Sequence, residues 1–128
     1  MAGEPILVVD SSVANLKLFE VLLGGAGYDV RTAADAPEAL EVLLELTPRL
    51  ILMDTELPGM DGLALVRRLR SEPRTQHLTI LALTRDAAAD TERLAMEAGC
   101  SGCVAKPVDL LGLVETVARH VRGAPGTR

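Results

Sequence analysis

Four apolar segments of this chain each end in a polar residue whose side chain could take part in phosphoryl transfer. These residues are Asp10 after segment 6–9, Asp54 after 50–53, Thr84 after 78–83 and Lys106 after 103–105. Short apolar runs are typical of strands buried on both faces, and such a strand should not end in a carboxylate unless it opens there into a solvated site. We therefore take the four side chains as candidates for one common site.

Together, these four residue types have the chemistry needed to receive a phosphoryl group. Two carboxylates a few ångströms apart repel each other unless a cation lies between them, and oxygen ligands open to water suit Mg²⁺. A lysine adds positive charge and a hydroxyl adds a hydrogen-bond donor, which together match the three equatorial oxygens of a phosphoryl group. A carboxylate beside the metal can act as the nucleophile. Each residue alone could be an ordinary polar strand end, but the set favours phosphoryl transfer onto an aspartate.

The segments between the apolar runs carry the apolar period and start signals of helices. Candidate N-caps precede four of them: Ser11 or Ser12, Asp35, Asp61 and Asp109. In the second helix we expect Leu40, Leu43 and Leu44 to face inward, and we expect Pro58 and Gly59 to form a turn before the third helix. Five strands alternating with five helices predict an α/β domain with a parallel sheet, whose strand ends meet at one edge.

Composition limits the class of protein. A chain of 128 residues suits one domain, which we expect to span residues 4–122 with a flexible tail or linker stub at 123–128. The net charge of -5, with one Tyr, one Phe and no Trp, disfavours nucleic-acid binding. No apolar run approaches the ~20 residues of a membrane span, and the N-terminus has no signal-like region. We expect a soluble, cytoplasmic protein.

Cys100 and Cys103 have the spacing of a redox or metal motif. A redox pair normally opens a helix, where the helix dipole lowers the thiol pKa, but this pair follows a helix and its Gly99 stop. Zinc would need two more ligands, and only His77 and His120 are available. Small buried fillers are the favoured interpretation over a functional thiol pair.

The whole pattern resembles the receiver domain of two-component response regulators, from about residue 6 to residue 121. The motifs that carry the resemblance are residues 6–10, 52–54 with 57–62, 81–84 and 105–107. The resemblance implies a flavodoxin-like, doubly wound sheet of five parallel strands in the order 2-1-3-4-5, with five helices. It implies that Asp54 is the phosphoacceptor, and that Asp10, Asp54 and the Glu56 backbone carbonyl bind Mg²⁺. It also implies that Thr84 and Lys106 bind the phosphoryl group, and that the Lys106–Pro107 bond is cis.

Three positions depart from the family pattern. Ser11 stands where the family usually has a second acid, so it would be an atypical and weak ligand and Mg²⁺ affinity should fall. The Glu56 side chain could lean toward the metal in compensation or remain an exposed loop residue. Arg85 could pair with Glu56, obstruct the phosphodonor, hold the phosphoryl group or point into solvent. Cys103 replaces the aromatic ring that usually turns inward on activation, so coupling of the switch hydroxyl to the output surface is absent or takes another form.

The leading functional hypothesis is a single-domain response regulator. It would accept a phosphoryl group on Asp54 from a sensor histidine kinase or a histidine phosphotransfer protein, and would assist only its own phosphorylation and dephosphorylation rather than act as an enzyme. Output would be binding of a protein partner through the fourth helix, fifth strand and fifth helix, and the sequence leaves a homodimer open. The alternative is a degenerate receiver that acts as a phosphorylation-independent interaction module, which Ser11, Arg85 and Cys103 favour. A flavodoxin-like cofactor binder is disfavoured, because the phosphate loop and aromatic residues it needs are missing.

Overall fold

The computed structural model describes residues 3–57, 60–84, 89–105 and 110–122. The strands are β1 (Pro5–Val9), β2 (Asp29–Ala33), β3 (Leu50–Asp54), β4 (Glu56–Leu57), β5 (Met60–Asp61), β6 (Thr79–Thr84) and β7 (Gly102–Ala105). The helices are α1 (Val13–Gly25), α2 (Ala36–Glu45), α3 (Gly62–Arg70), α4 (Ala89–Ala98) and α5 (Leu110–Arg122). No helix in these ranges is long and apolar enough to cross a membrane.

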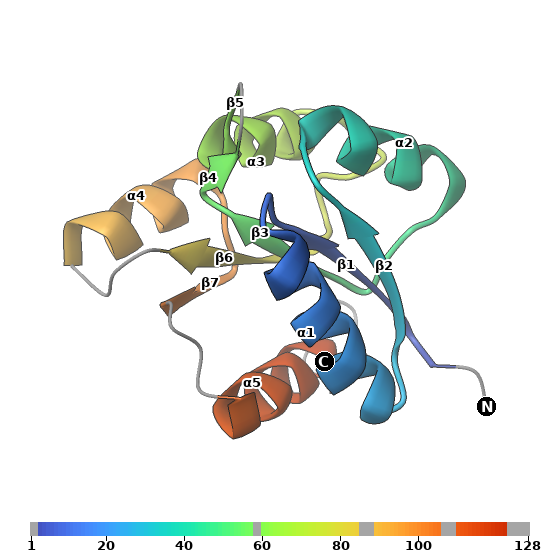
Figure 1. Ribbon diagram of the computed structural model, residues 1–128. Helices are drawn as coiled ribbons and strands as arrows, with labels where there is room; N and C mark the ends of the chain where they lie inside the picture. The colour runs from blue at the N-terminus through green and yellow to red at the C-terminus, as the bar shows by residue number, and fades with distance from the viewer. Residues whose placement is uncertain (1–2, 58–59, 85–88, 106–109, 123–128) are drawn as a thin grey trace.

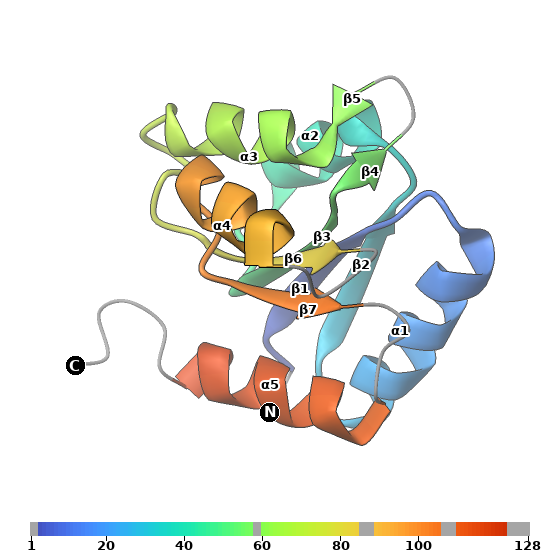
Figure 2. The same cartoon turned by 90° about the vertical axis from the view of Figure 1, so that its left-hand side faces the viewer.

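Five parallel strands form one sheet in the order β2-β1-β3-β6-β7 (Figure 1). Counted over these five strands the order is 2-1-3-4-5, so the predicted doubly wound fold is confirmed. Helices α1 and α5 cover one face of the sheet, and α2, α3 and α4 cover the other (Figure 2). Both faces are therefore buried, which explains why the central strands are almost continuously apolar.

Side chains alternate between the two faces along each central strand. Leu7, Ile51 and Ile80 belong to the core under α2, α3 and α4. Their neighbours Val8 and Leu52 belong to the core under α1 and α5. This period of two is set by strand geometry, so a one-residue slip would exchange the two cores.

Three of the predicted N-caps are present in the described residues. The Ser12 side chain accepts a hydrogen bond from Asn15 N at 3.2 Å, and Asp61 Oδ1 accepts one from Leu63 N at 3.0 Å. Asp35 Oδ1 accepts from Glu38 N at 2.9 Å, and Glu38 Oε1 reaches back to Ala34 N at 2.8 Å. Each cap satisfies N–H groups that the first helical turn leaves without a partner. The fourth predicted cap, Asp109, lies outside the described residues.

The prediction that Leu44 faces inward is wrong. Its exposed fraction is 69%, whereas Leu43 is 6% exposed and Leu40 is half-buried. The buried side of α2 is formed by Ala36, Ala39 and Leu43, whose spacings of three and four residues follow one helical stripe. Leu44 lies about 100° around the helix from Leu43, on the side away from Ala39, which carries it beyond the edge of that stripe.

The segment after Asp54 contains more than the predicted turn. Strands β4 and β5 pair antiparallel, with Glu56 opposite Asp61 and Leu57 opposite Met60. Such two-residue strands are too short to show a period in the sequence. The predicted Pro58–Gly59 turn itself lies outside the described residues.

Arg70 connects three chain segments at the end of α3. Its Nε donates to the Gly99 carbonyl at 2.8 Å, and its Nη1 donates to the carbonyls of Gln76 at 2.9 Å and Leu78 at 2.5 Å. Gly99 has a φ of +114°, and a Cβ there would lie 2.7 Å from Arg70 Cγ, so glycine suits both the turn and the packing. Burial lowers the pKa of Arg70 from its ordinary value. The guanidinium thus ties the end of α3 to the end of α4 and to the entry of β6.

Replacing Arg70 should destabilise the domain more than replacing its exposed neighbour Arg67. Arg70→Ala leaves three carbonyls without this donor, and we expect a loss of about 2–3 kcal/mol in the free energy of unfolding. Arg70→Lys keeps the charge but not the planar fork, so its loss should be intermediate. Urea denaturation measures all three variants, with Arg67→Ala expected within about 0.5 kcal/mol of the parent. An Arg70→Ala protein as stable as Arg67→Ala would contradict this role.

Candidate functional site

Three of the four candidate residues lie together at the carboxyl edge of the sheet. Asp54 ends β3, Thr84 ends β6, and Asp10 directly follows β1. Val9 is level with Met53 and Asp54 is level with Leu83, so the parallel register places the three side chains at neighbouring positions. All three are buried: Asp10 is 1% exposed, Asp54 6% and Thr84 2%. The predicted convergence is therefore present for these residues.

The Asp10 carboxylate is held by the start of α1. Ser12 N donates to Asp10 Oδ1 at 2.9 Å, and Asn15 Nδ2 donates to Asp10 Oδ2 at 3.2 Å. Asn15 is the third residue of α1. Because side chains of a helix lean toward its N-terminus, the Asn15 amide reaches the Asp10 carboxylate. Ser11, predicted as a weak metal ligand, is exposed. The role of Asn15 was not predicted from the sequence, although a polar side chain at the third position of a helix often forms a hydrogen bond with a residue at or before the N-cap.

The Asp54 carboxylate is oriented by the backbone that follows it. Glu56 N donates to Asp54 Oδ1 at 3.0 Å, and Thr55 N donates to the Leu83 carbonyl at 3.1 Å, which fixes the chain against β6. Glu56 itself is exposed at the start of β4. The chain after β3 thus orients the Asp54 carboxylate, because the Glu56 N–H group donates a hydrogen bond back to it.

Gly62 packs directly on the backbone of Asp54. Its N–H donates to the Thr55 carbonyl at 3.0 Å, and a Cβ at this position would lie 2.1 Å from the Asp54 carbonyl oxygen. No other residue fits without displacing the strand end, so α3 begins in contact with the candidate acceptor. The sequence holds one signal for this: a glycine in the first turn of a helix, where most residues have a better helix propensity.

The described residues offer a small set of oxygen ligands for a metal. Asp10 and Asp54 supply two buried carboxylates from neighbouring strands. In the described ranges no group of three His, Cys, Asp or Glu side chains could hold a metal ion, so further ligands would be backbone carbonyls and water. Mg²⁺ is commonly bound through one or two carboxylates and keeps several waters, so this donor set fits it.

The two cysteines have the environment of packing residues. Cys100 is buried, and burial raises the pKa of its thiol to about 11, with a smaller contribution from Cys103. Cys103 is half-buried against the core under α4, and burial together with Glu92 raises its pKa. Both thiols are free, and their protonated forms are favoured at neutral pH. This supports the interpretation of buried fillers over a reactive thiol pair.

Some of the predicted site lies outside the described residues. These positions are Arg85 after β6, Lys106 and Pro107 after β7, and the expected tail at 123–128. The lysine's role, the cis peptide bond and the effect of the arginine therefore stay predictions.

Comparison with known proteins gives the family. The family model described as "Response regulator receiver domain" matches residues 6–118. Response regulator PleD of Caulobacter vibrioides is 38% identical over 104 residues, which are 81% of this chain but only 23% of the length of PleD. Polar-differentiation response regulator DivK of Brucella anthropi is 29% identical over 93% of this chain and 97% of its own length. The receiver domain of a sensor histidine kinase from Pseudomonas aeruginosa, solved with a magnesium ion in its active site cleft, has a TM-score of 0.85 and 30% identity over 94% of this chain and 98% of its own. This chain belongs to the response regulator receiver domain family of two-component signalling, as the resemblance of its motifs implied.

Proposed function

We propose that this receiver domain accepts a phosphoryl group on Asp54 from the phosphohistidine of a sensor histidine kinase or of a histidine phosphotransfer protein, with Mg²⁺ as cofactor. One observation carries the proposal: Asp54 is a buried carboxylate at the end of β3, and a second buried carboxylate, Asp10, directly follows the neighbouring strand β1 at the same edge of the sheet. Two such groups are costly to bury unless a cation compensates them. Its chemistry would be confined to its own aspartate, so we do not propose an enzyme with a separate substrate.

In the proposed transfer, an Asp54 oxygen attacks the phosphorus atom, the P–N bond of the phosphohistidine breaks, and the imidazole leaves with its bonding electron pair. Mg²⁺ held by the Asp10 and Asp54 carboxylates would supply positive charge to the phosphoryl oxygens. The Glu56 N–H holds Asp54 Oδ1 and so orients the carboxylate for attack. By the family resemblance we assign the Thr84 hydroxyl, buried at the end of β6, to one phosphoryl oxygen on Asp54 and Lys106 to a second.

The exposed side of α1 supports docking of a protein phosphodonor. The helix begins at Val13, three residues after Asp10. Val13 is 69% exposed, Leu18 40% and Val21 72%, so one side of α1 offers apolar side chains to solvent. Exposed apolar patches of this kind commonly mark protein contacts. We place the donor on α1, and the output partner on α4, β7 and α5, where Leu94 and Met96 are also exposed.

Phosphorylation of Asp54 is tested with a small-molecule phosphodonor. Incubation with Mg²⁺ and acetyl phosphate should add one phosphoryl group to the protein, observed by intact-mass spectrometry. Asp54→Asn keeps the shape of the side chain but removes the nucleophile, so its mass should not change. Failure to form an adduct with acetyl phosphate or phosphoramidate would reject the proposal and favour the phosphorylation-independent interaction module.

Mg²⁺ affinity is predicted to depend on Asn15. Asn15→Ala removes the hydrogen bond that orients Asp10, and loss of such a partner typically weakens metal binding about 10-fold or more. NMR titration of backbone amides with Mg²⁺ measures the dissociation constant without any phosphodonor. Glu20→Ala is the control, because Glu20 is exposed farther along α1 and should affect binding little. Ser11→Asp should strengthen binding by adding a carboxylate. Equal Mg²⁺ affinity for Asn15→Ala and the parent would show that Asn15 does not support the site.

A further inference from the structure

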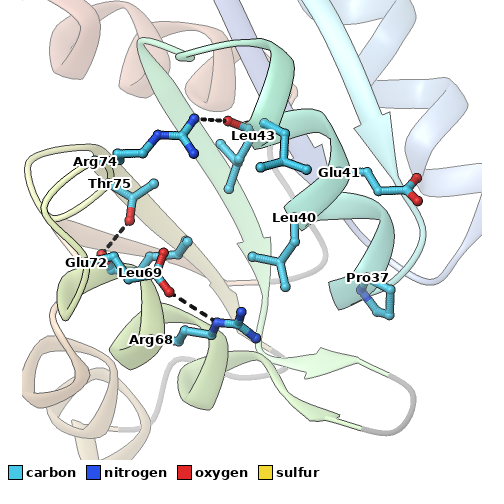
Figure 3. Close-up of a pocket in the computed structure, with 10 residues that line it drawn as sticks. Pro37, Leu40, Glu41, Leu43, Arg68, Leu69, Glu72, Arg74 and Thr75 are labelled. Atoms are coloured by element: carbon cyan, nitrogen blue, oxygen red, sulfur yellow. Dashed lines mark hydrogen bonds and ion pairs between the residues drawn. The ribbon is translucent and has the colours of Figure 1, made fainter.

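A groove between α2 and α3 lies on the face of the sheet opposite α1 and α5. Its volume is about 260 Å³, and its floor includes Leu40, Leu43 and Leu69 (Figure 3). Arg74 closes one end, because its Nη2 donates to the Leu43 carbonyl at 3.1 Å and so spans from the segment after α3 to α2. Thr75 Oγ1 donates to the Leu69 carbonyl at 2.6 Å and fixes the same segment to α3. The segment after α3 is therefore tied by hydrogen bonds to both helices that border the groove.

The two walls of the groove carry opposite charge. On α2 the charged residue that lines the groove is acidic, Glu41. On α3 and the segment after it, the charged lining residues are Arg68 and Arg74, with Glu72 as the acidic exception. Arg68 Nε lies 3.4 Å from Glu72 Oε2, but both side chains are about half-exposed, and such a pair is weak in water. Figure 3 shows Glu41 and Arg68 on opposite sides of the groove with Leu40 between them.

Leu44 lies at the edge of this groove and faces solvent. It belongs to the groove lining, yet 69% of it is exposed. A surface that combines an apolar groove, an exposed apolar side chain, an acidic wall and a basic wall can be complementary to itself. Self-complementarity is what a two-fold interface requires, since the same patch is used on both copies.

We propose that two copies of this chain associate through the α2–α3 groove, with Leu44 of each copy entering the groove of the other. Helices α2 and α3 each connect parallel strands of one sheet, so they run in the same direction. A two-fold axis along the groove places α2 of one copy over α3 of the other, and Glu41 then faces Arg68 of the second copy. An axis across the groove would instead place α2 of one copy over α2 of the other. That arrangement brings the acidic sides of the two copies together, and like-charge repulsion disfavours it. The charge pattern thus selects one symmetric arrangement.

The proposed dimer should be weak and reversible. Its core is one leucine and one groove per copy. Interfaces this small lie at the low end of the buried area found in specific protein complexes. Analytical ultracentrifugation from micromolar to millimolar protein should show a concentration-dependent dimer. Leu44→Glu should raise the dissociation constant at least about 10-fold, because it removes the central apolar anchor. Gly24→Glu is the matched control, because it adds the same charge at an exposed position of α1, on the opposite face of the sheet, where an added side chain meets nothing within 4 Å.

Charge exchange tests the arrangement of the two copies. Glu41→Arg and Arg68→Glu should each weaken self-association, because each places like charges opposite one another in the homodimer. An equimolar mixture of the two variants should form a heterodimer, since every facing pair is then Arg opposite Glu. Circular dichroism confirms that each variant is folded, as all substituted residues are exposed. A parent protein that stays monomeric at millimolar concentration, or a dimer insensitive to Leu44→Glu and to charge exchange, would overturn the proposal.

Discussion

The burial of two carboxylates at the ends of neighbouring strands is the constraint on which the functional edge of this domain depends. Asp10 and Asp54 are almost inaccessible to water, and removing a charge from water is costly unless hydrogen bonds or an opposite charge compensate it. The chain meets part of that cost with N–H groups: Ser12 and Asn15 donate to Asp10, and Glu56 donates to Asp54. The turns after β1 and β3 are therefore shaped by the acids that precede them.

The same constraint explains why the helices begin where they do. Helix α1 begins just after the Ser12 N–H that holds Asp10 and carries Asn15, its second donor, while α3 begins at a glycine packed against the Asp54 carbonyl. The two acids are thus attached to different layers, since α1 covers one face of the sheet and α3 the other. A cation between them would bind carboxylate oxygens that the fold has already oriented. This lowers the entropy cost of ordering the site when the cation binds.

Residues that follow from strand periodicity could be predicted from the sequence, and residues that depend on a single contact could not. Asp10, Asp54 and Thr84 were predictable because parallel strands end at a common edge whatever the details of packing. Asn15 and Gly62 act through one side-chain hydrogen bond and one missing Cβ, and neither leaves a periodic pattern. Leu44 was misassigned because consecutive leucines do not reveal which one lies on the buried stripe.

Helix α3 is common to the acceptor site and to the α2–α3 groove. Its first residue contacts the backbone of Asp54, while Arg68 and Leu69 in its later turns line the groove. A helix anchored at Arg70 to the ends of α4 and β6 is likewise restrained at its other end, so it would shift as a unit rather than bend. If phosphorylation of Asp54 alters the position of α3, it must alter the affinity of one copy for another, and dimerisation must alter phosphorylation to the same extent. If α3 stays in place, this helix carries no coupling between the two events, because a ligand shifts only those states that it distinguishes.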